Sequence, residues 1–221
     1  VKYMWEEMQR KNERGEQLND DELYLSQIAS MPHLGNSAYW GRKRFNEGRF
    51  HEALMYFENI NEYIESNFFD ANFSEELREF FARKCFYMSV CHCELGRYEL
   101  GVYYAEKACV IYSSPLHQTT LIKAMYRAND FRLIAEIRRN MEEMESRMDE
   151  TKDDDILRDT HTDIYEFLQK ALALSFIRYG KWDDAKQRLE IIIKEASEEA
   201  AVWAKEQLAK INLSKQTSDQ S

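Results

Sequence analysis

The sequence predicts an all-α fold, and this prediction depends on three observations. The 221 residues include only seven Gly and two Pro, far fewer than turn-rich sandwiches and barrels use. Between these residues the apolar side chains recur with the period of about 3.6 residues that is typical of amphipathic helices. No apolar run approaches the roughly 20 residues that span a bilayer. We therefore expect a helical chain that is long enough to bury its own core.

The expected helices lie between these few helix-breaking residues. Asp20 or Asp21 can cap a short helix that continues through Met31, and Pro32 should end it because proline cannot continue a helix. Ser74 is expected to cap the helix that runs to Leu95. The other helices are expected over residues 2–14, 38–45, 51–66, 98–112, 115–128, 132–148, 156–179, 183–195 and 198–213.

One pattern repeats in the turns between helices. In the first turn, Gly48 is followed by the aromatic Phe50 and then by the small Ala53. We expect the Gly to end one helix in the left-handed conformation, the ring to wedge between the two helices, and the small residue to let them approach closely. The pattern recurs as Gly96-Arg97-Tyr98 with Gly101 and as Gly180-Lys181-Trp182 with Ala185, and a degenerate copy, Asn129-Asp130-Phe131, is followed by Ile134.

With these turns, the chain resembles the tetratricopeptide repeat (TPR) family. The best matches are residues 38–60, which carry Trp40-Gly41 and Phe57, and residues 171–193, which carry Leu189. The resemblance implies an α-solenoid of antiparallel helix pairs. The turns are separated by 48, 33 and 51 residues instead of one regular repeat length, so we expect irregular and extended helices. A generic α-solenoid or a helical bundle is the structural alternative.

The resemblance also divides the chain into three parts. Residues 1–33 are expected to form an N-terminal helical cap. Residues 34–213 would form the TPR-like helical repeat array, with about four helix pairs and a C-terminal capping helix. Residues 214–221 are a polar tail that we expect to be disordered.

The resemblance further implies a concave wall that is formed by the first helix of each pair. The wall positions include six basic residues and one acidic residue, in a chain of net charge −10. Such a wall would suit an acidic or carboxylate-bearing peptide with apolar anchors. Alternatively, its apolar members are core residues and its basic members pair with acidic second helices. The residues expected to bind a partner are Arg42, Arg83, Phe86, Lys123, Tyr126, Arg127, Phe167, Lys170 and Arg178.

The cysteines and one histidine near residue 90 resemble a metal cluster only in the linear sequence. On one helix, Cys91 and Cys93 would point about 160° apart, so they cannot bind the same ion. Cys85 and His92 would share a face, but they provide two ligands at most. We therefore expect buried structural thiols, with no metal and no cofactor.

Nothing in the sequence indicates an enzyme active site. There is no Gly-rich phosphate loop, nucleophile elbow or dinucleotide-binding fingerprint. A helix that carries His161 between Asp159 and Asp163 could provide an acid–base pair. This region is strongly acidic, however, so we expect His161 to be a plain surface residue.

Within the charged segment 132–148, apolar residues recur at heptad spacing and form a stripe along one face of the expected helix. It could form a coiled-coil seam or a soft partner-binding surface. We expect it instead to be the face that packs on neighbouring helices. Its members are Ile134, Ile137, Met141, Met144 and Met148.

Composition limits the possible functions. A net charge of −10 argues against general nucleic-acid binding. Four Cys at irregular spacing and the absence of a visible signal peptide favour a cytoplasmic protein, and no membrane association is expected.

The leading hypothesis is a non-catalytic module that binds a partner protein or peptide in a TPR-like groove. The alternatives are a ligand- or peptide-sensing regulatory domain of a larger protein and, less favoured, a small-molecule enzyme built on a helical bundle.

Overall fold

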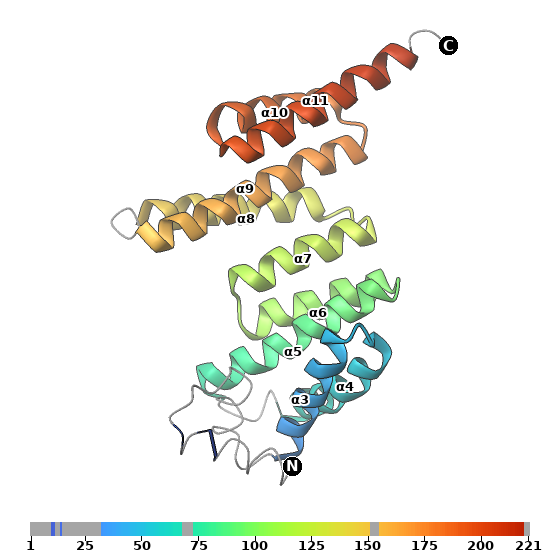
Figure 1. The fold of residues 1–221 in the computed structure, drawn as a ribbon, viewed down its shortest axis with the longest axis vertical. Helices are drawn as coiled ribbons and strands as arrows, with labels where there is room; N and C mark the ends of the chain where they lie inside the picture. The colour runs from blue at the N-terminus through green and yellow to red at the C-terminus, as the bar shows by residue number, and fades with distance from the viewer. Residues whose placement is uncertain (1–9, 12–13, 15–31, 68–72, 151–154, 219–221) are drawn as a thin grey trace. The chain divides into compact units, whose positions relative to one another are not determined.

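The computed structural model describes residues 10, 11, 14, 32–67, 73–150 and 155–218. Within these residues all regular secondary structure is α-helical (Figure 1). The expected helices at 2–14 and 20–31 lie outside the described residues, apart from residues 10, 11 and 14. The chain divides into two compact units, residues 1–128 and residues 129–221. The all-α prediction is therefore confirmed for the part of the chain that the structure describes.

The described helices of the first unit are α3 to α7, in chain order (Figure 1). Consecutive helices pack against each other, and α5 also contacts α3 and α7. The central helix α5 therefore touches each of the other described helices of the unit. The bounds are α3 (Pro32–Asn46), α4 (Phe50–Asn67), α5 (Glu75–Glu94), α6 (Tyr98–Ile111) and α7 (Pro115–Ala128).

Aromatic side chains fill the core of the first unit. The rings of Phe57 on α4 and Tyr87 on α5 stack with their centroids 5.4 Å apart. Phe80 and Phe81 on α5 are fully buried, and their rings meet edge to face at 5.6 Å. Aromatic pairs in these geometries stabilise a fold beyond the area that they bury. The stack of Phe57 on Tyr87 joins α4 to α5.

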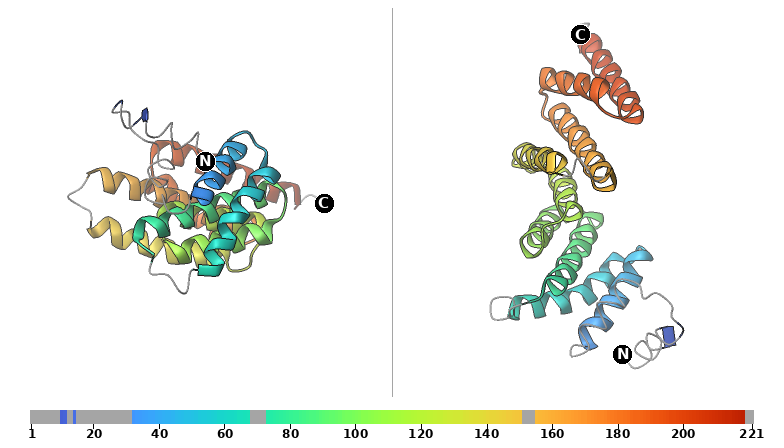
Figure 2. Two further views of the ribbon diagram at one scale, coloured as in Figure 1. Left: turned by 90° about the horizontal axis from the view of Figure 1, so that it is seen from below. Right: turned by 90° about the vertical axis from the view of Figure 1, so that its left-hand side faces the viewer.

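The second unit contains four described helices. In Figures 1 and 2, α8 lies beside α9 and α10 lies beside α11. The helix α9 also contacts α10 and α11. The bounds are α8 (Leu133–Glu150), α9 (Asp155–Arg178), α10 (Trp182–Glu195) and α11 (Glu198–Ser218).

The apolar stripe on α8 faces into the second unit. Ile137, Met141 and Met144 are buried, and Ile134 and Met148 are half-buried. Since α8 packs on α9, the structure confirms the expectation that this stripe is a packing face.

Two helix boundaries differ from the expectation by five residues or more: the start of the helix expected at residue 38 and the end of the last helix. Pro32 begins α3, where its missing N–H costs nothing because the first turn has no partner for it. At the other end, α11 continues to Ser218, five residues beyond the expected end of the helix at residue 213. No Gly or Pro occurs over residues 214–218, so nothing in the local sequence breaks the helix there.

The four expected turn residues adopt the left-handed conformation. Gly48, Gly96 and Gly180 have φ of 72°, 74° and 69°, and Asn129 has φ of 56°. At each Gly turn, the N–H of the next residue bonds to the carbonyl five positions before it, which closes a helix end in the Schellman manner. These bonds run from Arg49 N to Arg44 O, from Arg97 N to His92 O and from Lys181 N to Phe176 O, at 2.9, 2.8 and 2.8 Å.

The small residues of the turn pattern lie at close helix contacts, as expected. Ala53 and Ala185 are fully buried. A Cβ on Gly101 would lie 2.4 Å from Cys93 Sγ and 3.3 Å from the carbonyl oxygen of Ser89. The small residues therefore allow α5 and α6, like the other pairs, to approach closely.

The aromatic residues of the pattern do not all act as wedges. The half-buried Phe50 packs against Phe45 at 5.8 Å. Tyr98 and Trp182 are partly exposed, and Phe131 is 89% exposed. The wedge prediction is therefore wrong for Phe131, and at this turn it is Leu133 that is fully buried.

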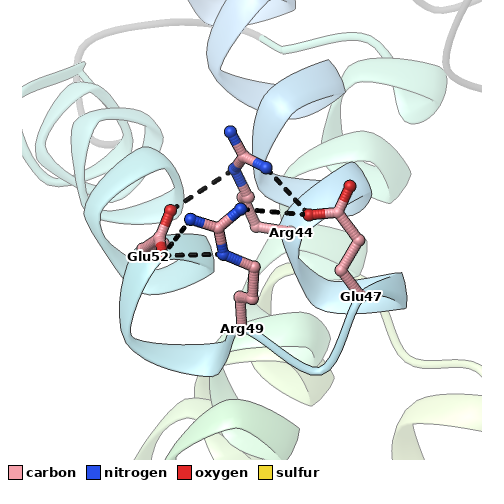
Figure 3. A network of polar contacts seen from close by, with 4 residues as sticks. All are labelled: Arg44, Glu47, Arg49 and Glu52. Carbon is pink, nitrogen blue, oxygen red and sulfur yellow. Dashed lines mark hydrogen bonds and ion pairs between the residues drawn. The ribbon is translucent and has the colours of Figure 1, made fainter.

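An ion-pair network closes the turn between α3 and α4 (Figure 3). Arg44 Nη1 lies 2.8 Å from Glu47 Oε2, and Arg44 Nε lies 3.4 Å from Glu52 Oε2 on the next helix. Arg49 lies between the same two carboxylates, at 3.5 Å from Glu47 and 2.5 Å from Glu52. The hydrogen bond from Arg44 lowers the pKa of the Glu47 carboxyl. Because all four side chains are partly exposed, we expect each pair to contribute little stability.

Enlarging the small turn residues should destabilise the chain. Ala53→Trp and Ala185→Trp place a large ring at fully buried positions, so each should lower the free energy of unfolding by about 1–3 kcal/mol or more. Urea denaturation measures the change. Ala135→Trp, on an exposed position of α8, is the matched control and should be nearly neutral. Unchanged stability in both buried variants would contradict the close helix contacts.

The left-handed conformation of Gly48 gives a separate prediction. A Cβ at Gly48 would meet nothing within 4 Å, so the cost of Gly48→Ala is that of the backbone alone, about 1–2 kcal/mol. Gly48→Asn should cost less, since Asn tolerates this conformation and already adopts it at Asn129. Thermal or urea denaturation of the two variants tests this order, and an equal loss for Ala and Asn would contradict it.

Candidate partner-binding site

The residues expected to bind a partner lie on the helices that the repeat pattern assigns to them. Six belong to the first unit and three to the second. Arg42 lies on α3; Arg83 and Phe86 lie on α5; Lys123, Tyr126 and Arg127 lie on α7; and Phe167, Lys170 and Arg178 lie on α9.

In the first unit, α5 and α7 are joined by an ion pair at their C-terminal ends. Arg127 Nη1 donates to Glu94 Oε1 at 2.6 Å. This hydrogen bond raises the pKa of the arginine. Both side chains are more than a third exposed, so a competing carboxylate in solution could reach the guanidinium. We expect the pair itself to add little stability.

Arg83 and Phe86 are engaged in contacts of α5. Arg83 Nη2 donates to Glu79 Oε1 at 2.6 Å, one turn earlier on the same helix. Phe86 is half-buried, and its ring lies 5.1 Å from that of Tyr87 and 6.5 Å from that of His117 on α7. The alternative expected from the sequence, in which the wall residues also serve structure, therefore applies in part to both residues.

His117 is a buried polar group at the start of α7. Its side chain is 3% exposed, and Nδ1 lies 2.7 Å from the carbonyl oxygen of Tyr112. That contact requires Nδ1 to carry the proton, so Nε2 is left as an acceptor. In the described part of the chain Nε2 has no hydrogen-bond partner. Burial lowers the pKa of His117, and the ring is therefore neutral at pH 7.

His92 is a second buried histidine, on α5. Its ring stacks on that of Tyr104 with a centroid distance of 5.2 Å and an interplanar angle of 3°. Burial lowers the pKa of His92, and Arg97 adds to the effect. His92 therefore acts as a neutral aromatic surface for α6.

The cysteines near His92 are buried, as the sequence predicted. Burial raises the pKa of Cys85 and of Cys91 to about 12, and it also raises the pKa of Cys93. The thiolate is the form that binds metals, and burial disfavours it here. Among the described residues no group of three His, Cys, Asp or Glu side chains could hold a metal ion.

Two lysines of the first unit have roles that the sequence did not indicate. Lys107 on α6 reaches α4, where its Nζ lies 2.6 Å from Asn61 Oδ1 and 2.8 Å from Glu65 Oε1. The hydrogen bond from Lys107 lowers the pKa of Glu65. Lys84 on α5 is almost completely buried, with its ammonium 4.6 Å from the centre of the Phe80 ring. A polar Asn61 between apolar positions of α4 was the one signal in the sequence for the first of these contacts.

In the second unit, α9 carries the remaining expected residues. Lys170 places its ammonium 5.9 Å from the centre of the Trp203 ring on α11, within reach of a cation–π interaction. Phe167 is half-buried and Arg178 is exposed. Lys170 therefore contributes to the packing of α11 as well as to surface charge.

His161 differs from the expectation. It is 9% exposed and thus buried, whereas we expected a surface histidine; the prediction is wrong. The flanking Asp159 and Asp163 are exposed, so the acidic composition of the segment belongs to the other faces of α9. The hydroxyl of Tyr165 donates to Glu145 of α8, which shows that this part of α9 lies against α8.

No family model, curated protein or solved structure matches the chain. In the described part, no helix is long and apolar enough to cross a membrane. The class of protein is therefore defined by its fold alone, as an all-helical protein in which consecutive helices pack together.

The buried histidines predict a pH dependence of stability. An unfolded histidine has a pKa of about 6.5, and burial lowers the pKa of His92 and His117 in the folded chain. Between the two pKa values the unfolded chain binds more protons, so stability rises with pH. The contribution of these histidines to the free energy of unfolding should be constant above about pH 7 and should fall as the pH drops from about 6.5 toward 5.

Urea denaturation at about pH 7.5, 6.5 and 5.5 measures this slope. His92→Gln with His117→Gln should flatten it, whatever the overall stability of the variant. His51→Gln, at an exposed position, is the control and should keep it. Carboxylates whose pKa is lowered, such as Glu65, also contribute to the free energy of unfolding. That contribution is lost only below about pH 4.5. A slope that persists in the double variant would contradict the assignment.

Proposed function

We propose that this chain is a non-catalytic, TPR-like interaction module that binds an acidic segment of a partner protein. The binding surface would be formed by α3, α5 and α7 of the first unit. The same surface would also serve a regulatory domain that senses a peptide. The proposal includes no catalytic step and no cofactor.

Three features support a TPR-like arrangement. The turn residues Gly48, Gly96 and Gly180 share one backbone conformation and one hydrogen-bond pattern. A Cβ on Gly41 would lie 2.5 Å from the Phe57 ring, so the large–small pair Trp40-Gly41 lies at a close contact of α3 with α4. The first helices of successive pairs, α3, α5 and α7, contact one another through α5.

The observation that carries the proposed binding is a segregation of charge. Together, α3, α5 and α7 contain eight basic and four acidic residues, a net charge of +4, in a chain of net charge −10. We call these three helices the basic group. A positive surface on an acidic protein attracts and orients an acidic partner.

Aromatic side chains of the basic group can supply apolar anchors. Phe86 on α5 and Tyr126 on α7 are each half-buried, so part of each ring remains available to a partner. Anchors of this kind carry much of the binding energy at protein interfaces, and surrounding charges set the rate and the specificity of association.

Charge reversal on the basic group tests the proposal. Arg42→Glu, Lys123→Glu and Arg127→Glu together should weaken binding to an acidic partner at least about tenfold at low salt, because like charges then face each other. Partners captured by the immobilised chain from native lysate and identified by mass spectrometry would be purified and their affinities measured. In the unaltered chain, the affinity should also fall as salt is raised, since the Debye length is about 8 Å at physiological ionic strength.

A matched control changes the same number of charges elsewhere. Lys181→Glu, Lys194→Glu and Lys205→Glu alter exposed positions of the second unit and should leave the affinity within about twofold. Circular dichroism and melting curves establish that both triple variants fold. If binding survives reversal of the basic group, or falls equally in the control, the partner does not bind at α3, α5 and α7.

A further inference from the structure

The other two helices of the first unit carry the opposite charge. Together, α4 and α6 contain one basic and six acidic residues, a net charge of −5. We call them the acidic group. The positive charge of the basic group comes from α3 and α7, since α5 contains four acidic and three basic residues, whereas α4 and α6 are both acidic.

Exposed apolar side chains lie among these acidic residues on both helices. On α6, Tyr103 is 49% exposed and Val110 is 76% exposed; seven residues apart, they lie on one side of the helix. On α4, Met55 is 66% exposed and precedes Glu58 and Glu62 at helical spacing. A face that served only solubility would not need large apolar side chains at these positions.

The two stripes belong to one surface because α4 and α6 are joined there. The only basic residue of the acidic group, Lys107, is bonded to Asn61 and Glu65 across the two helices. Burial is the largest cause that raises the pKa of Tyr104 on α6 to about 12. The negative charges of Glu65 and Glu58 add to this effect. These carboxylates of α4 therefore lie close to the aromatic residues of α6.

The acidic charge of this surface is not fully compensated within the first unit. Glu65 is paired with Lys107, and Glu52 is paired with arginines of the first turn. Among the described residues no ion pair reaches Glu58 or Glu62. Two exposed carboxylates thus remain beside exposed apolar groups.

We infer that α4 and α6 form a second docking surface, which binds a basic amphipathic helix of a partner protein. Lysines or arginines of that helix would pair with Glu58 and Glu62, and its apolar side chains would cover Met55, Tyr103 and Val110. The charge of the surface selects this occupant. A second copy of the chain fits less well, because two molecules of net charge −10 repel each other. This inference does not depend on the function proposed for the basic group.

Two synthetic peptides of about 18 residues, or five helical turns, provide the probe. One has a Leu face and a Lys face, and the other has Glu in place of Lys. Fluorescence anisotropy with the full chain should show 1:1 binding of the Leu–Lys peptide, at least about tenfold tighter than the Leu–Glu peptide at low salt.

Two variants locate the binding. Tyr103→Ser with Val110→Ser removes the apolar part of the surface, and Glu58→Lys with Glu62→Lys reverses its charge. Each should weaken the Leu–Lys complex at least about tenfold. The matched control is Val202→Ser with Glu206→Lys, at exposed positions of α11. Its affinity for the Leu–Lys peptide should stay within about twofold of that of the unaltered chain. All these positions are exposed or half-exposed, and melting curves establish that the variants fold.

Several outcomes would overturn the inference. The inference is wrong if the unaltered chain does not bind the Leu–Lys peptide, if the control variant weakens the complex as much as the α4–α6 variants do, or if neither α4–α6 variant weakens it. Sedimentation velocity of the chain alone tests the remaining occupant: self-association that is lost in Tyr103→Ser with Val110→Ser would assign the surface to a second copy. Reversal of Arg42, Lys123 and Arg127 should not weaken the Leu–Lys complex, so this inference and the function proposed above can fail separately.

Discussion

The burial of α5 is the constraint on which the first unit depends. This helix contacts α3, α4, α6 and α7, and its buried side chains include Phe80, Phe81 and Met88. Between Phe80 and Cys93 this helix has little surface left for solvent, since every residue there is buried or half-buried. Several of its polar residues are satisfied within the protein: Arg83 binds Glu79, Ser89 donates to the carbonyl of Gly101, and the Lys84 ammonium lies over the Phe80 ring.

The distribution of charge follows from that arrangement. The exposed charges of α5 lie at its two ends, at Glu75, Glu76, Arg78 and Glu94, because its middle is enclosed by the other helices. The helices α3 and α7 contain basic residues without any acidic residue, and α4 contains acidic residues without any basic one. Direct contacts such as Arg44 with Glu52 and Lys107 with Glu65 neutralise only part of this separation. The remaining charge is the basis of the two binding surfaces that we propose.

Sequence reasoning located the helices and their turns well because these depend on local residues. A Gly or Asn at the end of a helix and a small residue five positions after the Gly are visible in the sequence, and both appear in the structure at Gly48 and Ala53. The exposure of Phe131 and the burial of His161 could not be obtained in this way. They depend on which face of a helix is covered by another helix, and a local pattern does not contain that information.

For the candidate site, the sequence indicated which residues to consider but not which side chains they contact. The repeat register assigned basic residues such as Lys123 and Arg127 to the inner wall, but it did not identify Glu94 as the partner of Arg127. Nor did it identify the contact of Lys107 with α4, since Asn61 and Lys107 are 46 residues apart. Long side chains choose partners from helices that only the tertiary structure brings together.

The contact between Gly101 and Cys93 has an evolutionary consequence. The space that a Cβ on Gly101 would need is occupied by Cys93 Sγ, 2.4 Å away. The two positions therefore share one fixed volume: residue 101 can acquire a side chain only if residue 93 becomes smaller. Related chains that carry Ala at the position of Gly101 should carry a smaller residue at the position of Cys93, and the two substitutions should be inherited together.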